Sequence, residues 1–175
     1  MKKIVIIGPE STGKSTLSEQ LANHYGTCWC PEYAREYLMK LEGKYTYEDL
    51  LKIAQGQAEQ EDRLLTQARN GFYFIDTEMY VMKVWCEVAF ENCHTWIMKQ
   101  AARRSYSLYL LCDVDLPWKP DALREYPDLA MRQRLFRMYK DIMVNQETPW
   151  GLVSGTDEQR LNTAVSIIDS VFKRN

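Results

Sequence analysis

Hydrophobic residues follow two patterns along the chain, and the two patterns alternate. Short runs rich in β-branched and aromatic residues, which favour strands, occur at 3–7, 27–30, 72–75, 107–112 and 151–154. Between them lie longer stretches with apolar residues three or four positions apart, the spacing of a helix with one buried face. Strands that alternate with helices need crossover connections. We therefore expect an α/β fold with one largely parallel sheet, covered by helices on both faces.

Residues that start or stop helices divide the chain further. Pro31 is expected to open a helix that Gly43 stops, and Asn70-Gly71 is expected to end the helix after it. Thr46 and Asp49 have the spacing of a capping box at the start of that second helix. The proline-bearing segment 115–128 is expected to be irregular, because proline interrupts both helix and strand.

The first predicted strand runs into the sequence GPESTGKS at 8–15, which matches the phosphate-loop pattern G-x-x-x-x-G-K-[ST] with a helix after it. Glycines let backbone N–H groups approach phosphate oxygens, the lysine supplies a cation, and the serine hydroxyl suits Mg²⁺. A chance glycine-rich turn is the alternative. We predict binding of ATP and Mg²⁺, through Gly8, Glu10, Ser11, Thr12, Gly13, Lys14, Ser15 and Thr16. The pattern alone separates neither hydrolysis from phosphoryl transfer nor ATP from GTP.

An aspartate, Asp76, ends the third predicted strand, and parallel strands bind ligands beyond their carboxyl ends. There it can hold Mg²⁺, partly through water, with Ser15, or accept the proton of an attacking hydroxyl. The alternative is that Asp76 caps the next helix.

The segment 115–132 is interpreted as a small lid that carries two cations, Arg124 and Arg132. Phosphoryl transfer needs cations to neutralise the transferred group and needs water to be excluded. With Lys14 and Asp76, these arginines are the predicted catalytic residues; a solvated basic surface is the alternative. Asp121 is expected either to orient Arg124 or to cap a turn.

The sequence CPEYARE after the second strand is the candidate acceptor site. Glu32 can bind a sugar hydroxyl and Arg35 can organise the site, although glutamate is also common at an ordinary helix start. A GTPase would carry an N-K-x-D guanine-reading motif, which this sequence lacks. The pattern therefore favours a small-molecule kinase over a GTPase.

Composition limits the remaining classes of function. With 175 residues we expect a single domain, 1–175, and a net charge of −2 gives no general electrostatic attraction for nucleic acid. No apolar run approaches the roughly 20 residues of a membrane span. Five cysteines without metal-site spacing, and no targeting segment, indicate a reducing cytoplasm. The oligomeric state is left open, and a homo-oligomer is one option.

Several motifs recur in a familiar order: GPESTGKSTL, PEYAREYL, YTYEDLLKIAQGQ, FIDTE, LYLLCDVDLPWKPDALRE and VSGTDEQRL. Together they resemble the ribosylnicotinamide kinase domain of NadR-type proteins over essentially the whole chain. The resemblance implies a three-layer P-loop NTPase fold of the nucleoside kinase type with strand order 2-3-1-4-5. It also implies MgATP-dependent phosphorylation of the 5′-hydroxyl of nicotinamide riboside, which yields nicotinamide mononucleotide for NAD salvage.

The resemblance also assigns residues. It implies that SGTDEQR is the turn that receives adenine, with Gly155 and Arg160 contributing and Arg160 as a stacking plane. DTE stands where such kinases often read DTD, and DALR where DGLR is common, so the acceptor is open to drift. The adenylyltransferase domain of such proteins is not part of this sequence, so we expect no adenylyltransferase activity.

The fixed pyridinium charge of nicotinamide riboside favours a site with aromatic faces and carboxylates. Tyr80, Trp85 and Trp118 are the candidate aromatic contacts, and an ordinary core position is the alternative for each. Two other functions stay open: a kinase for another nucleoside or small alcohol, and an ATP-binding regulatory protein.

Overall fold

A five-stranded parallel sheet forms the centre of the computed structural model, which describes residues 1–41 and 44–172. The strand order is β2-β3-β1-β4-β5, which confirms the expected fold. The strands are β1 (Lys2–Ile7), β2 (Trp29–Cys30), β3 (Phe72–Asp76), β4 (Leu108–Cys112) and β5 (Trp150–Val153). The helices are α1 (Lys14–Tyr25), α2 (Tyr33–Lys40), α3 (Tyr47–Leu65), α4 (Met79–Phe90), α5 (Thr95–Arg103), α6 (Leu129–Asn145) and α7 (Asp157–Phe172).

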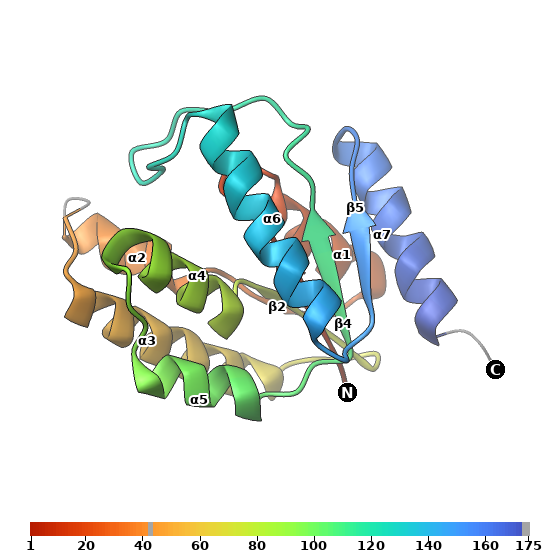
Figure 1. The fold of residues 1–175 in the computed structure, drawn as a ribbon. Helices are drawn as coiled ribbons and strands as arrows, with labels where there is room; N and C mark the ends of the chain where they lie inside the picture. The colour runs from red at the N-terminus through yellow and green to blue at the C-terminus, as the bar shows by residue number, and fades with distance from the viewer. Residues whose placement is uncertain (42–43, 173–175) are drawn as a thin grey trace.

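Alternate side chains of the strands enter two separate cores, as the two-residue period of a strand requires. Ile4 and Ile6 of β1 pack with α1 and α7 on one face. Val5 and Ile7 pack with α4 and α6 on the other. A third apolar cluster joins α2, α3, α4 and α5, which lie together at the left and lower left of Figure 1. The result is the three-layer arrangement expected from the sequence.

Helix ends differ from the sequence predictions where tertiary contacts compete. The helix predicted to run to Asn70-Gly71 ends at Leu65, and these two residues instead turn the chain so that Phe72 N–H binds the Arg69 carbonyl at 3.1 Å. Residue 31 does not open α2, which begins at Tyr33 because Glu32 before it has an extended backbone, with φ −66° and ψ 113°. The Tyr33 N–H is bound by the Gln57 side chain of α3. The predicted stop at residue 43 lies outside the described residues. The Thr46–Asp49 capping box is confirmed.

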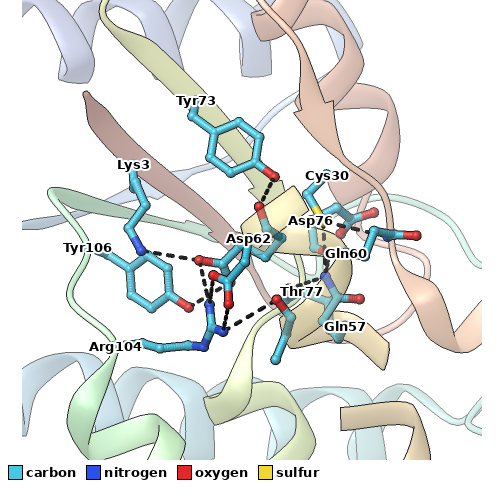
Figure 2. Close-up of polar contacts among 12 residues, drawn as sticks. Lys3, Cys30, Gln57, Gln60, Asp62, Tyr73, Asp76, Thr77, Arg104 and Tyr106 are labelled. Atoms are coloured by element: carbon cyan, nitrogen blue, oxygen red, sulfur yellow. Dashed lines mark hydrogen bonds and ion pairs between the residues drawn. The ribbon is translucent and has the colours of Figure 1, made fainter. Parts of the chain in front are cut away.

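A buried ion-pair cluster fixes α3 against the start of β1 (Figure 2). Glu61 of α3 is 1% exposed, and its carboxylate lies 3.2 Å from Lys3 Nζ and 3.1 Å from Arg104 Nη1. Tyr106 OH donates to the same carboxylate at 3.0 Å. Arg104 also pairs with Asp62 at 2.7 Å. Each charge of Glu61 and its partners is thus compensated, which burial requires.

Candidate functional site

Parallel strands bring the phosphate loop and Asp76 to the same edge of the sheet. Ile6 of β1 is in register with Asp76 of β3, and Gly8 follows directly after β1. Gly8 has φ 147°, and a side chain there would come within 2.8 Å of the Cys112 carbonyl at the end of β4. Only glycine therefore lets the chain leave β1 between the ends of its two neighbours.

The loop over residues 8–15 wraps around one carbonyl group. Thr12 Oγ1 and Lys14 Nζ both donate to the Pro9 carbonyl, at 2.8 and 2.9 Å. Gly13, with φ 78°, is the N-cap of α1 and has no side chain to occupy the first N–H groups of the helix. Those groups and the helix dipole form an anion site next to a lysine, as the sequence predicted.

Asp76 is completely buried beside the loop and points toward it. Ser15 Oγ donates to Asp76 Oδ2 at 2.5 Å, whereas Oδ1 has no hydrogen-bond partner among the described residues. Burial and the negative charge of Glu32 raise the pKa of Asp76 to about 6, against the attraction of Lys14 and the Ser15 hydrogen bond. The carboxylate is therefore a base near neutral pH, and its two hard oxygens with the Ser15 hydroxyl suit Mg²⁺.

The alternative that Asp76 caps the next helix is wrong, because Glu78 does so. Glu78 Oε1 accepts a hydrogen bond from Tyr80 N–H at 2.8 Å at the start of α4. Burial is the main cause that raises the pKa of this carboxyl to about 8, so it is mostly neutral at pH 7. The sequence analysis assigned Glu78 no role; its position directly before the helical repeat that starts at Met79 was the available signal.

The two predicted lid arginines meet the phosphate loop. Arg132 of α6 is 3% exposed, and its Nη2 donates to the carbonyls of Ser11 and Leu116 at 3.2 and 3.3 Å. Arg124 Nη1 donates to Ser11 Oγ at 3.4 Å and to the Lys119 carbonyl. Burial and the charge of Arg124 lower the pKa of Arg132. A solvated surface therefore does not describe Arg132.

The lid and the loop are also joined by Glu10, which sequence analysis grouped with the ATP-binding residues. Glu10 Oε2 accepts hydrogen bonds from the N–H groups of Glu125 and Tyr126, at 3.0 and 3.2 Å. Burial raises the pKa of Glu10. Its carboxylate thus faces the lid and not the helix that follows the loop.

A cavity of about 110 Å³ lies between the phosphate loop, α2, α4, α6 and the lid. Its lining includes the predicted acceptor residues Glu32, Arg35 and Trp85, with Lys14 and Glu10 at the loop. Sequence analysis missed the lining residues Tyr126, Leu135 and Tyr139; the last two lie four residues apart on α6, the spacing of a shared helix face.

An ion pair and two hydrogen bonds join the lid to α2 and α4 around this cavity. Arg35 pairs with Asp121 at 2.8 Å, and Asp121 also accepts from Leu123 N–H at 3.1 Å, so it caps a turn as one alternative proposed. Trp85 Nε1 donates to Tyr45 OH at 2.8 Å, and Tyr45 OH donates to Glu125 at 3.0 Å.

Two predicted aromatic contacts lie away from the cavity lining. Tyr80 packs against Tyr109, with ring centroids 6.0 Å apart. Trp118 lies against the guanidinium groups of Arg124 and Arg132, at 5.8 and 5.6 Å from its ring centroid. The structure thus places Trp118 with the lid arginines, while Tyr80 contributes to the core.

A second cavity, of about 310 Å³, opens on the other side of the phosphate loop. Its lining is Ser11, Gly13, Thr16, Leu116, Pro117, Lys119, Arg124 and Thr156. Arg160 is not in this lining: it is 2% exposed and donates to the carbonyls of Val153 and Asp113, each at 3.1 Å, and to Asp115. Gly155 N–H also binds Asp115, at 2.5 Å. Arg160 therefore supports the turn from beneath and offers no free stacking face.

Within residues 1–41 and 44–172, each helix is too short or too polar to span a membrane. This part of the chain also contains no cluster of three or more His, Cys, Asp or Glu side chains that could bind a metal ion. The cysteines within the described residues are free thiols.

Known proteins resemble this chain in sequence and in fold. The NadR proteins of Escherichia coli (strain K12) and Salmonella typhimurium, described as trifunctional NAD biosynthesis/regulator proteins, are each 32% identical over 128 residues. These matches cover 71% of this chain but only 31% of each relative. The chain thus spans about a third of the length of the relatives it matches, and the resemblance inferred from the motifs is confirmed.

Solved structures agree on the fold. A crystal structure of NadR protein in complex with NR has a TM-score of 0.76 at 19% identity, and covers 99% of this chain and 52% of that chain. Thymidylate kinase from Ehrlichia chaffeensis has a TM-score of 0.66 at 15% identity, covering 96% and 98%. Residues 3–160 match the family model described as an AAA domain, and the chain belongs to this family.

Proposed function

We propose that this chain is an ATP-dependent kinase that phosphorylates the 5′-hydroxyl of nicotinamide riboside to give nicotinamide mononucleotide. One observation carries the proposal: the phosphate loop lies between two cavities. Gly8, Glu10 and Lys14 line one of them, and Ser11, Gly13 and Thr16 line the other. A phosphoryl group bound at the loop is thus within reach of molecules on both sides.

The nucleotide is assigned to the second cavity. Its lining contains Gly13 and Thr16 at the start of α1 and Thr156 of the SGTDEQR turn, and the helix N-terminus favours phosphate. A solved structure of NadR protein in complex with NAD and AMP-PNP, at 20% identity, is consistent with a nucleotide site in this fold. Ser15 and Asp76 would hold Mg²⁺, partly through water, and the ion would neutralise charge on the phosphates.

The acceptor is assigned to the first cavity. The carboxylates of Glu10 and Glu32 and the indole of Trp85 line it, which suits a ligand that combines hydroxyl groups with a fixed positive charge. The NadR structure in complex with NR supports a nucleoside of this kind.

Each catalytic side chain then has a defined task. The acceptor hydroxyl attacks the γ-phosphorus, its proton passes to the Asp76 carboxylate, and ADP leaves. Lys14, Arg124 and Arg132 neutralise charge on the transferred group, since all three surround the loop. The lid, residues 115–132, excludes water when it covers the loop.

A second candidate is a kinase for another nucleoside, because the cavity wall is largely apolar and discriminates weakly between rings. Val81, Val84 and Leu135 belong to that wall. Product analysis with MgATP or MgGTP and a panel of nicotinamide riboside, uridine and deoxynucleosides separates the candidates. Nicotinamide mononucleotide must form fastest, and Lys14→Ala must form none. ATP loss that is independent of any acceptor would contradict both kinase proposals. We also propose, from the sequence, a single domain and a cytoplasmic protein.

A further inference from the structure

One buried side-chain amide joins the two backbone segments that carry the proposed catalytic and acceptor-binding carboxylates. Gln57 of α3 is 1% exposed, and its Oε1 accepts a hydrogen bond from Tyr33 N–H at 2.7 Å. Its Nε2 donates to the Thr77 carbonyl at 3.0 Å and makes 3.5 Å contacts with the carbonyls of Asp76 and Pro31. Figure 2 shows the Gln57 amide close to Cys30, Asp76 and Thr77.

The segment that Gln57 holds is strained. Thr77 has φ 75°, a region that β-branched residues rarely adopt. Thr77 N–H reaches the Ile6 carbonyl at 3.4 Å, and the shorter bond from Gln57 holds the other side of the residue. Because Asp76 directly precedes Thr77, relaxation of this turn would redirect the Asp76 carboxylate away from Ser15.

The other end of the amide fixes the start of α2. Tyr33 is the first residue of α2 and follows Glu32, which lines the acceptor cavity. Gln57 itself can act as a rigid link because Glu61, one turn further along α3, is held by Lys3, Arg104 and Tyr106.

We propose that Gln57 is a positioning residue for phosphoryl transfer. Its amide holds the Asp76–Thr77 turn and the start of α2 at a fixed separation, so that Asp76 faces the phosphate loop and Glu32 faces the acceptor. Gln57 lines neither cavity and does not touch the substrates. This inference rests on the proposed function, in which Asp76 accepts the proton.

Gln60 provides a matched control on the next turn of the same helix. Gln60 Nε2 donates to the Pro31 carbonyl at 2.7 Å and lies 3.6 Å from Cys30 Sγ. Its hydrogen bonds within the described residues do not extend to Asp76 or Thr77. Methionine matches glutamine in shape and in helix propensity, so Gln57→Met and Gln60→Met each remove one amide from α3.

The test is a double-mutant cycle in turnover at saturating MgATP and nicotinamide riboside. We expect Gln57→Met to lower kcat about 10- to 100-fold, as for a small misplacement of a reacting group, with KM for ATP unchanged. Gln60→Met should stay within about twofold of wild type. In an Asp76→Asn background Gln57→Met should change kcat by less than about threefold, because it acts through Asp76. Equal losses in both backgrounds would overturn the proposal.

Crystal structures of the variants give a readout that needs no acceptor. In Gln57→Met the Thr77 backbone should leave the positive φ region and the contact between Ser15 and Asp76 should break; in Gln60→Met both should persist. An unchanged turn in Gln57→Met would overturn the role of Gln57. If Gln57→Met does not fold, Gln57→Asn, whose shorter amide cannot reach both partners, replaces it in both measurements. If wild-type protein phosphorylates no nucleoside, the proposed function fails, and the crystal structures still decide the role of Gln57.

Discussion

The ionised carboxylate of Asp76 is expected to destabilise the folded protein, although the proposed reaction requires it. Burial and the charge of Glu32 raise the pKa of its carboxyl from 3.8 to about 6 in the folded protein. Below pH 3.8 the carboxyl is neutral in both the folded and the unfolded chain, and its burial has no ionisation cost. Between pH 3.8 and about 6 the carboxyl ionises in the unfolded chain before it does in the folded one, so the folded state loses about 3 kcal/mol by the upper end of this range, at 1.36 kcal/mol per pKa unit.

Asparagine cannot ionise, so Asp76→Asn removes this pH-dependent cost. We expect the free energy of unfolding of the variant, relative to wild type, to increase by about 2–3 kcal/mol between pH 4 and pH 7.5. For a chain of this length that corresponds to a relative rise in Tm of roughly 5–10 °C. Any cost of an unpaired amide hydrogen is the same at both pH values and cancels in this difference.

The assay is urea or thermal unfolding of nucleotide-free protein at several pH values. Asp141→Asn, which removes an exposed aspartate of α6, controls for the general loss of a negative charge. Turnover of Asp76→Asn should fall at least ~10²-fold, and turnover of wild type should rise with pH as the base deprotonates. A stability difference that does not change with pH would refute the assigned pKa. Turnover like that of wild type would refute the assigned role.

Three further substitutions test the rest of the site. Lys14→Ala should abolish phosphoryl transfer in a kinase assay and leave the circular dichroism spectrum unchanged, because within the described residues the Lys14 side chain donates to a single loop carbonyl, that of Pro9; retained transfer would contradict the phosphate-loop assignment. Arg132→Ala should lower kcat at least ~10-fold through lost charge neutralisation, and a full rate would remove the lid hypothesis. Glu78→Gln should gain stability relative to wild type as the pH rises from 5 to 9, because the buried acid of wild type, with its pKa raised to about 8, must then ionise. A difference in the free energy of urea unfolding between variant and wild type that stays constant across that range would contradict the burial argument.

Local patterns predicted most of the fold because each depends on residues close in sequence. The phosphate loop needs eight consecutive residues, and the Thr46–Asp49 capping box needs four. Asp76 could be placed because parallel strands must end at a common edge, which makes a strand-ending aspartate a neighbour of the loop. The helix predicted to end at Asn70-Gly71 shows where local patterns fail. Helical spacing of apolar residues continues past Leu65, but the helix ends there and Arg69 pairs with Phe72 at the start of β3.

The sequence by itself determined the order of strands and helices, the anion site at α1 and the identity of the buried carboxylate beside it. Tertiary structure alone decided which distant groups complete that site: Gln57 meets Thr77 across 20 residues, and Arg132 meets Ser11 across 121. It also turned Arg160 beneath its loop and Glu10 toward the lid. The physical reason is that hydrogen bonds act over about 3 Å in space, and sequence separation carries no information about which loops a folded sheet brings within that distance.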